Sequence, residues 1–309
     1  MIGAGVLALP QVTSAPGFVL SCGAMAVVWP YCVASGVIVA ECSGGGRDSI
    51  QEMAEASIGR AAGNVMCAAF LASNYLLMVA YTSARDHPSC PVFRYLRRAF
   101  ALPVGLASLW GPARLMENAN EALVGLVGLS FVGLMCTGIP HMDTLLLPAM
   151  LPVAICALAF QNVVPAVSKN LSGDATNIRS SLVIGSGVPL LIYTLWNEVV
   201  LGNADSLEAS LGAGTSPMDT VAASSPVLGL LVMTFSISAI IRSFWGAAFS
   251  LMIECTHLVA RHDGILKTAA TALVLVPPAL VSVACPDSFL SALQYTGIYI
   301  DPLLYGLAP

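Results

Sequence analysis

A long uncharged segment with a polar interruption near its middle constrains this chain most. Residues Thr144 to Ser168 carry no charged side chain, and a run of that length can cross a bilayer as a helix. Gln161 and Asn162 place two amides inside the run, and Pro165 lacks a backbone N–H. Within hydrocarbon, an interrupted helix is tolerated only where the freed backbone groups face protein or a water-filled cavity. The interruption favours half of a binding pocket; the alternative is a proline kink whose amides bond to neighbouring helices.

The composition indicates a polytopic membrane protein. Of the 309 residues, 57% are hydrophobic and only 9% are charged, and the mean hydropathy is +0.83. A soluble domain carries roughly 25% charged residues because its surface faces water. The net charge of -5 comes without a basic tract, which argues against a nucleic-acid partner. We expect one all-α transmembrane domain over residues 1–309, embedded in the lipid bilayer, with about nine to ten membrane segments.

The first apolar segment has a similar interrupted character. Gly3, Gly5 and Pro10 lie close together in the sequence, which lowers the cost of unwound backbone and of close approach by a ligand. A pair of apolar segments interrupted by glycine or proline in corresponding halves is typical of the binding site of a secondary transporter. The alternative is a glycine-rich packing helix. Because this first segment and the last one, Phe289 to Pro309, are both incomplete as spanning helices, we expect the chain to be truncated at both ends.

Three aromatic or acidic features in the other segments give further expectations. Tyr75 lies at the middle of the span 61–84 and is a candidate for lining the pocket, with bonding to a neighbouring helix as the alternative. Trp196 lies near the end of the span 180–201 and is predicted to be an interfacial anchor. The stretch Gly202 to Ala223 contains acidic residues but no lysine or arginine, which predicts a non-cytoplasmic loop.

Two charged residues fall inside apolar segments. Arg242 lies within the span 226–252, where a central arginine costs roughly 2.5–3.5 kcal/mol on translocon scales, so a functional role is the first interpretation. Tolerance near a helix end is the alternative. Asp301 is a second intramembrane charge and a candidate proton carrier. The arginines between Arg85 and Arg98 break the positive-inside rule, and their role stays open.

No pattern in the chain indicates an enzyme or a metal site. The nine cysteines are scattered without metal-ligand spacing, which is typical of small packing residues. The four histidines fall in or near polar loops, without the spacing of a metal site or a catalytic triad. They are His87, His141, His257 and His262. We therefore expect no catalytic residues, no metal and no cofactor.

Several short motifs together resemble a known transporter family. The motifs are Gly3 to Pro10, Phe160 to Pro165, Gly173-Asp174 with Ile178-Arg179, Pro189, Trp196-Asn197 with Leu201-Gly202, Ser243-Phe244 with Gly246, and Pro277-Pro278. In order and spacing they resemble the tryptophan/tyrosine permeases, the hydroxy and aromatic amino acid permease group of the amino acid, polyamine and organocation transporter superfamily. The plant and algal members are the most similar.

The resemblance implies a fold, a function and a set of site residues. The fold would be of the leucine-transporter type, two inverted five-helix repeats with broken helices 1 and 6. The function would be proton-coupled symport of tyrosine or tryptophan by alternating access, with sodium as an alternative coupling ion. The backbone of Gly3, Ala4 and Gly5 would bind the substrate carboxylate. The amino group and side chain would be surrounded by Phe160, Gln161 and Asn162, and Ser243 would help to hold the coupling cation.

Two departures from the family pattern support a rival hypothesis. Gln161 stands where the family usually has histidine, which removes a group that titrates near neutral pH. Arg242 stands where threonine is usual, so that a fixed positive charge would replace the bound cation. The rival is a non-transporting amino acid sensor, or a degenerate or fragmentary permease paralogue. The oligomeric state stays open, as does the choice between plastid envelope and plasma membrane.

Overall fold

The computed structural model is helical throughout the residues that it describes. These are residues 5–14, 16–43, 49–83, 103–107, 109–137, 151–211, 217–260, 266–285 and 288–307. The helices are α1 (Gly5–Thr13), α2 (Phe18–Cys42), α3 (Ile50–Ser57), α4 (Arg60–Ser83), α6 (Ala113–Thr137), α7 (Leu151–Leu158), α8 (Val164–Asn170), α9 (Ala175–Leu211), α10 (Pro217–Ser224), α11 (Pro226–Ala260), α12 (Leu266–Ala284) and α13 (Phe289–Tyr295). A 3₁₀ turn, η1 (Gln161–Val163), and two π-helical stretches, η2 (Thr296–Ile300) and η3 (Leu303–Leu307), complete the elements.

Five stretches among the described residues are long and apolar enough to cross a membrane. They are Phe18–Cys42, Arg60–Ser83, Leu151–Asn170, Ala175–Leu201 and Pro226–Thr256. A sixth apolar helix, Thr268–Ala284, is shorter. The prediction of an all-helical, polytopic membrane protein is confirmed at this level, and the expected total of nine to ten segments stays a prediction.

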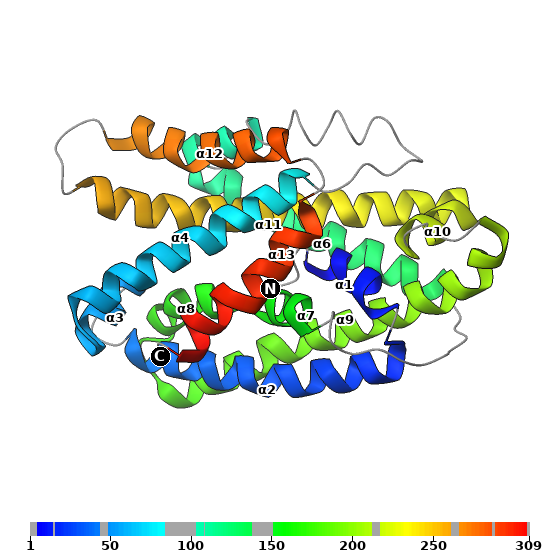
Figure 1. Cartoon of the computed structure of the whole chain (residues 1–309), viewed down its shortest axis with the longest axis horizontal. Coiled ribbons are helices and arrows are strands. Elements are labelled where there is room, and N and C mark those ends of the chain that lie inside the picture. Colours follow the sequence, from blue (N-terminus) through cyan, green and yellow to red (C-terminus); the bar gives the residue numbers. More distant parts are fainter. Residues whose placement is uncertain are drawn as a thin grey trace.

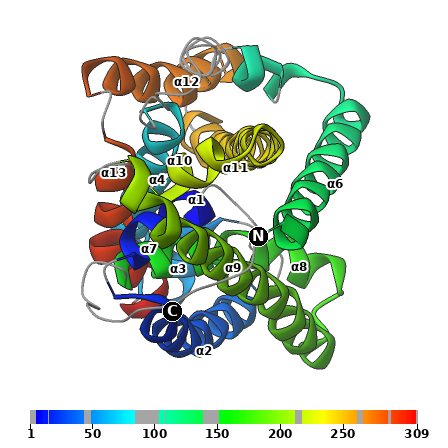
Figure 2. The same cartoon turned by 90° about the vertical axis from the view of Figure 1, so that its right-hand side faces the viewer.

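The short helices α1 and α7 lie at the centre of the arrangement. Figure 1 shows them between the pair α2 and α9, which run side by side, and the group α4, α11 and α12. Figure 2 gives the same order from the end of the molecule and places α6 at an outer edge, where it packs against α11. Val153 and Ala154 of α7 have no exposed surface. The inner face of α7, in the first half of the interrupted span, therefore packs against protein, where a break in a membrane helix is tolerated.

The stretch Gly202 to Ala223 is largely helical, so the prediction of a loop was wrong. Helix α9 continues beyond the span to Leu211, and α10 begins at Pro217. The acidic residues misled the prediction because they indicate contact with water but not the loss of helix. The sequence between Gly202 and Leu211 contains no proline and consists largely of residues that a helix tolerates.

Trp196 is buried in the core, so the prediction of an interfacial anchor was also wrong. Its ring stacks on Phe235 of α11, with 4.6 Å between the ring centroids, and both side chains have no exposed surface. The next residue, Asn197, is likewise buried and accepts a hydrogen bond from the Thr13 hydroxyl of α1. The Trp196-Asn197 motif therefore joins α9 to both α11 and α1.

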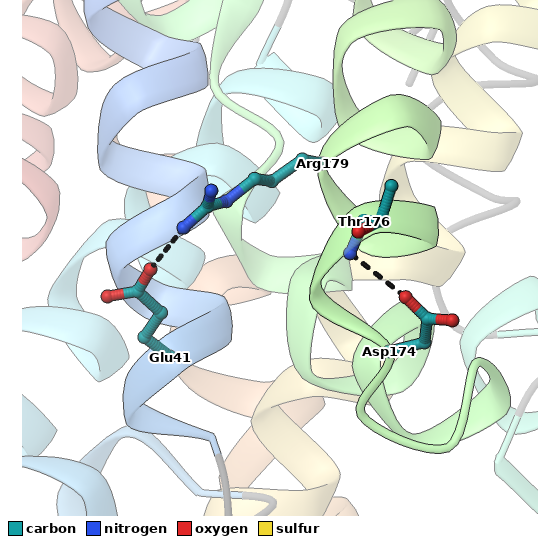
Figure 3. Close-up of polar contacts among 4 residues, drawn as sticks. All are labelled: Glu41, Asp174, Thr176 and Arg179. Carbon is teal, nitrogen blue, oxygen red and sulfur yellow. Dashed lines mark hydrogen bonds and ion pairs between the residues drawn. The ribbon is translucent and has the colours of Figure 1, made fainter.

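The turn from α8 to α9 explains a second motif of the sequence. Gly173 adopts a φ of 77°, in the left-handed region that favours glycine. Asp174 then accepts hydrogen bonds from the backbone N–H groups of Thr176 at 2.9 Å and Asn177 at 3.1 Å, and so caps the start of α9. Figure 3 shows this cap beside the ion pair in which Arg179 donates to Glu41 of α2 at 3.0 Å.

The Arg179–Glu41 pair connects α9 to α2 at the surface and contributes little to stability. The two side chains are 61% and 62% exposed, and exposed ion pairs typically contribute about 0–1 kcal/mol. The motif Gly173-Asp174 with Arg179 therefore has a local structural role. It ends α8, caps the start of α9 and links α9 to α2.

The aromatic contact between α9 and α11 predicts a large difference between two phenylalanines of the same helix. Phe235→Ala should lower the free energy of unfolding by about 3–5 kcal/mol, the range for buried aromatic truncations, because it leaves a cavity against Trp196. Phe249 of α11 is 61% exposed, so Phe249→Ala should change it by about 1 kcal/mol or less. Thermal unfolding of the two purified variants in detergent measures the difference. Equal losses would contradict the packing described here.

Candidate functional site

The structure interrupts a membrane span at the polar pair of the sequence. Helix α7 ends at Leu158, η1 occupies the next positions, and α8 begins at Val164. Pro165 lies in the first turn of α8, where a missing backbone N–H costs nothing because that group has no partner within the helix. The amides and the proline thus separate two half-helices.

Gln161 supports the interruption from within the protein. Its side chain is 2% exposed, and its Oε1 accepts a hydrogen bond of 2.8 Å from the backbone N–H of Phe160. Its Nε2 donates to the backbone carbonyl of Cys32 in α2, at 3.4 Å. The side chain therefore satisfies a donor that the interruption frees and ties this point to α2.

A cavity of about 180 Å³ opens beside the interruption. That volume is well above the roughly 10–15 Å³ needed for one water on the same measure. The lining residues come from six elements of the chain and are Gly5, Ser73, Asn74, Leu77, Tyr81, Cys156, Ala157, Ala159, Phe160, Asn162, Val163, Ser243, Gly246, Ala247, Ser250, Asp301 and Tyr305. Four of the predicted site residues thus meet at one cavity: Gly5, Phe160, Asn162 and Ser243.

The wall near the chain's last helix carries polar groups. Asp301 is 4% exposed and accepts a hydrogen bond of 3.3 Å from the Ser73 hydroxyl of α4. The Tyr305 hydroxyl donates to Oδ1 of Asn162 at the interruption. Asn74 donates through its amide to the Phe70 carbonyl, and its buried Oδ1 has no hydrogen-bond partner within the described residues. The cavity therefore offers a carboxylate and an amide oxygen.

Other residues of the lining are aromatic or small. Phe160 is almost completely buried and fits against Gly36 of α2, where a Cβ would lie only 2.7 Å from its ring. Ala157, Ala159 and Ala247 contribute small side chains to the lining. A ligand with one apolar face and one charged or polar end would match this division.

Three of the predicted site residues are not placed on the cavity wall. Tyr75 points to α12, where its hydroxyl donates to the Leu273 carbonyl at 2.8 Å, which favours the alternative of bonding to a neighbouring helix. Gln161 faces α2 and the backbone, as described above. Arg242 lies outside the lining and interacts electrostatically with Tyr193 of α9, whereas its neighbour Ser243 lines the cavity and hydrogen-bonds with Tyr81. Gly3 and Ala4 lie outside the described residues.

The sequence contained a signal for one set of missed residues. Ser73, Leu77 and Tyr81 recur every four positions along α4, and Asn74 lies one position further, so all four share one face of the helix. Tyr75 lies about 100° around the helix from Asn74, which is enough to turn it to another neighbour. No comparable signal in the sequence indicates Tyr305.

The whole chain, residues 1–309, matches the model of the tryptophan/tyrosine permease family. The chain belongs to this family. The permease is 25% identical to tyrosine-specific transport system 1 of Haemophilus influenzae, over 96% of this chain and 81% of that protein. It is 25% identical to the low affinity tryptophan permease of Proteus vulgaris, over 96% and 80% of the two chains.

A third relative matches over a shorter region. The tryptophan-specific transport protein of Pseudomonas aeruginosa is 28% identical to the permease, over 64% of this chain and 53% of that protein. All three relatives named here are bacterial, so the expected plant or algal type stays a prediction, as does the superfamily. The family and the apolar helices make the permease an integral membrane protein.

The hydrogen bonds of Gln161 predict that its replacement lowers the stability of the protein even when no ligand is present. Gln161→Leu should destabilise the permease by about 1–3 kcal/mol, because the Phe160 N–H is then left buried without an acceptor. Gln11→Leu on the exposed face of α1 is the control and should have little effect. Thermal unfolding in detergent without substrate tests this. An unchanged unfolding temperature for Gln161→Leu would show that the side chain does not hold the interruption.

Proposed function

We propose that this protein is a secondary active transporter that carries an aromatic amino acid, tyrosine or tryptophan, together with a proton by alternating access. One observation carries the proposal: the interruption of a membrane span opens onto a cavity in a chain that belongs to a permease family. The names of the relatives indicate the substrate class. The mechanism needs no covalent chemistry, which agrees with the absence of an enzyme pattern in the sequence.

The two walls of the cavity support an aromatic amino acid as the ligand. The ring of Phe160 provides an apolar face on which an aromatic side chain could stack, and small side chains beside it leave room. The ammonium group requires acceptors, and Asn74 and Asn162, whose Oδ1 atoms are acceptors, line the cavity together with Ser243. The carboxylate would bind to the backbone at the start of α1, as the family resemblance implies for Gly3, Ala4 and Gly5.

We propose a leucine-transporter-type fold, in which α1 belongs to the first broken helix and α7, η1 and α8 form the sixth. The close contact of the two half-helices supports this assignment. A Cβ on Gly5 would lie 3.0 Å from both Cα and Cβ of Ala157 in α7, so glycine allows α1 to approach the interruption. Both helices line the cavity. This is the geometry in which two half-helices share one substrate.

A sensor or degenerate paralogue is the second candidate, and one observation favours it. Gln161 hydrogen-bonds to the backbone of Phe160 and Cys32, and as an amide it cannot titrate. A transporter therefore needs another coupling group, whereas a protein that only binds an amino acid does not.

Uptake into proteoliposomes distinguishes the two candidates. Labelled tyrosine and tryptophan should accumulate when the outside is acidic, by about tenfold per pH unit at equilibrium if one proton accompanies each substrate. A parallel sodium gradient tests the alternative coupling ion. Binding of labelled substrate without uptake or exchange, by protein whose folding is verified, would favour the sensor. Neither binding nor uptake would reject the proposed substrate class.

Gly5 provides a mutational test of the site. Gly5→Val should weaken binding of labelled tyrosine by more than about tenfold, because the added side chain pushes α1 away from Ala157 and alters the cavity wall. Gly125→Val on α6 is the matched control, since no atom lies within 4 Å of a Cβ there. Unchanged affinity in the Gly5 variant would contradict the assignment of α1 to the site.

A further inference from the structure

We propose that Asp301 carries the coupled proton of this transporter from the wall of the substrate cavity. A proton from the acidic side forms an O–H bond with the carboxylate while the cavity faces that side. The bond breaks and the proton passes to water when the cavity faces the other side. The proposal rests on the transport function proposed above and assigns its coupling group.

Asp301 has a defined position beside the interrupted helix. It follows directly on the π-helical stretch η2, and such wider turns occur frequently at functional sites. A Cβ on Gly297, one turn earlier, would clash with the backbone carbonyl of Pro152 in α7. The backbone that precedes Asp301 is therefore packed tightly on the first half-helix of the interrupted span. A movement of that half-helix would therefore shift the backbone that holds the Asp301 carboxylate.

The groups that face Asp301 are hydroxyls, phenols and thiols. Ser73 of α4 donates its hydrogen bond to the carboxylate. The titratable groups that interact with it are Tyr31 and Cys32 of α2, Tyr81 of α4, Cys156 of α7 and Tyr305 of η3. None of these described groups carries a positive charge at neutral pH, and neither does any residue that lines the cavity.

A buried carboxylate in such surroundings needs a neutralising partner. Asp301 is 4% exposed, and one hydrogen bond from Ser73 does not replace the hydration that an anion loses. A proton removes the charge, and so would a bound cation. In the proposed cycle, the carboxylate therefore gains or loses its neutralising proton when the cavity opens to water on one side or the other. A coupling group must behave in this way.

The proton fits this position better than the ammonium group of the substrate does. The ammonium group already has acceptors in the Asn74 Oδ1, which is 1% exposed and lacks a partner within the described residues, and in the backbone carbonyls that end α7. Asp301 instead bonds to Ser73 and lies one helical turn from Tyr305. Tyr305 lines both the substrate cavity and a smaller, mostly apolar cavity of about 40 Å³ between α2, α3 and α4.

Asp301→Asn separates coupling from substrate binding. In proteoliposomes with a gradient of one pH unit, the accumulation ratio of labelled tyrosine should fall about tenfold, to a ratio of about one between inside and outside, because the proton gradient no longer drives accumulation. Exchange of labelled for unlabelled tyrosine without a gradient should continue, and substrate-driven acidification of the lumen should disappear. Glu121→Gln, on an exposed part of α6, is the control and should leave all three measurements unchanged.

Each other result has a distinct meaning. Loss of both exchange and tyrosine binding in folded Asp301→Asn would show that Asp301 holds the ammonium group, and unchanged accumulation would show a structural role; either overturns the proposal. A wild-type protein without uptake or exchange would reject the transport function itself. If the Asp301→Asn variant does not fold, the Asp301→Glu variant tests the proposal instead. Retained accumulation with a displaced pH profile supports the proposal, and an identical pH profile overturns it.

Discussion

The structure depends on how one interrupted membrane helix satisfies its own backbone. At membrane depth, an unpaired N–H or carbonyl has no water to bond to, so an interruption persists only where the protein supplies the partners. Here Gln161 accepts from the Phe160 N–H and donates to α2, while the ring of Phe160 fits into the space that Gly36 leaves free. These contacts fix α2 against the interruption, and residues of the interruption line the cavity.

The cavity combines elements that the chain order keeps far apart. Helices α1 and α7 bring small residues close together, α4 contributes a row of polar residues, and the last helix contributes Asp301 and Tyr305. The hydrogen bonds from Ser73 to Asp301 and from Tyr305 to Asn162 cross between these elements. In the proposed transport cycle, a movement of these elements relative to one another would shift such bonds and would link the protonation of Asp301 to the conformation of the site.

The sequence predicted the helical class, the main spans and the position of the interruption, because those depend on the order of charges, amides and prolines along the chain. It failed where the result depends on the direction of a side chain. Tyr75 and Trp196 were assigned from their positions within a span, but the helix turns by about 100° per residue, so Asn74 and not Tyr75 reaches the cavity. Trp196 points inward onto Phe235 although it lies near a span end. The role of Tyr305 could not be predicted from the sequence, because its hydrogen-bond partner, Asn162, is distant along the chain.

The family resemblance implies a histidine at the position of Gln161, and the geometry described above suggests a physical reason for glutamine there. An amide has the same charge at every pH, so the support that it gives to the Phe160 N–H does not vary with protonation. A histidine in the same place would have to serve both as a backbone partner and as a titrating group, and its protonation would remove an acceptor from the interruption. If Asp301 is the proton site, the backbone partner of the interruption and the titrating group belong to different helices. The chain can then keep the interruption intact throughout the transport cycle while the charge in the cavity changes.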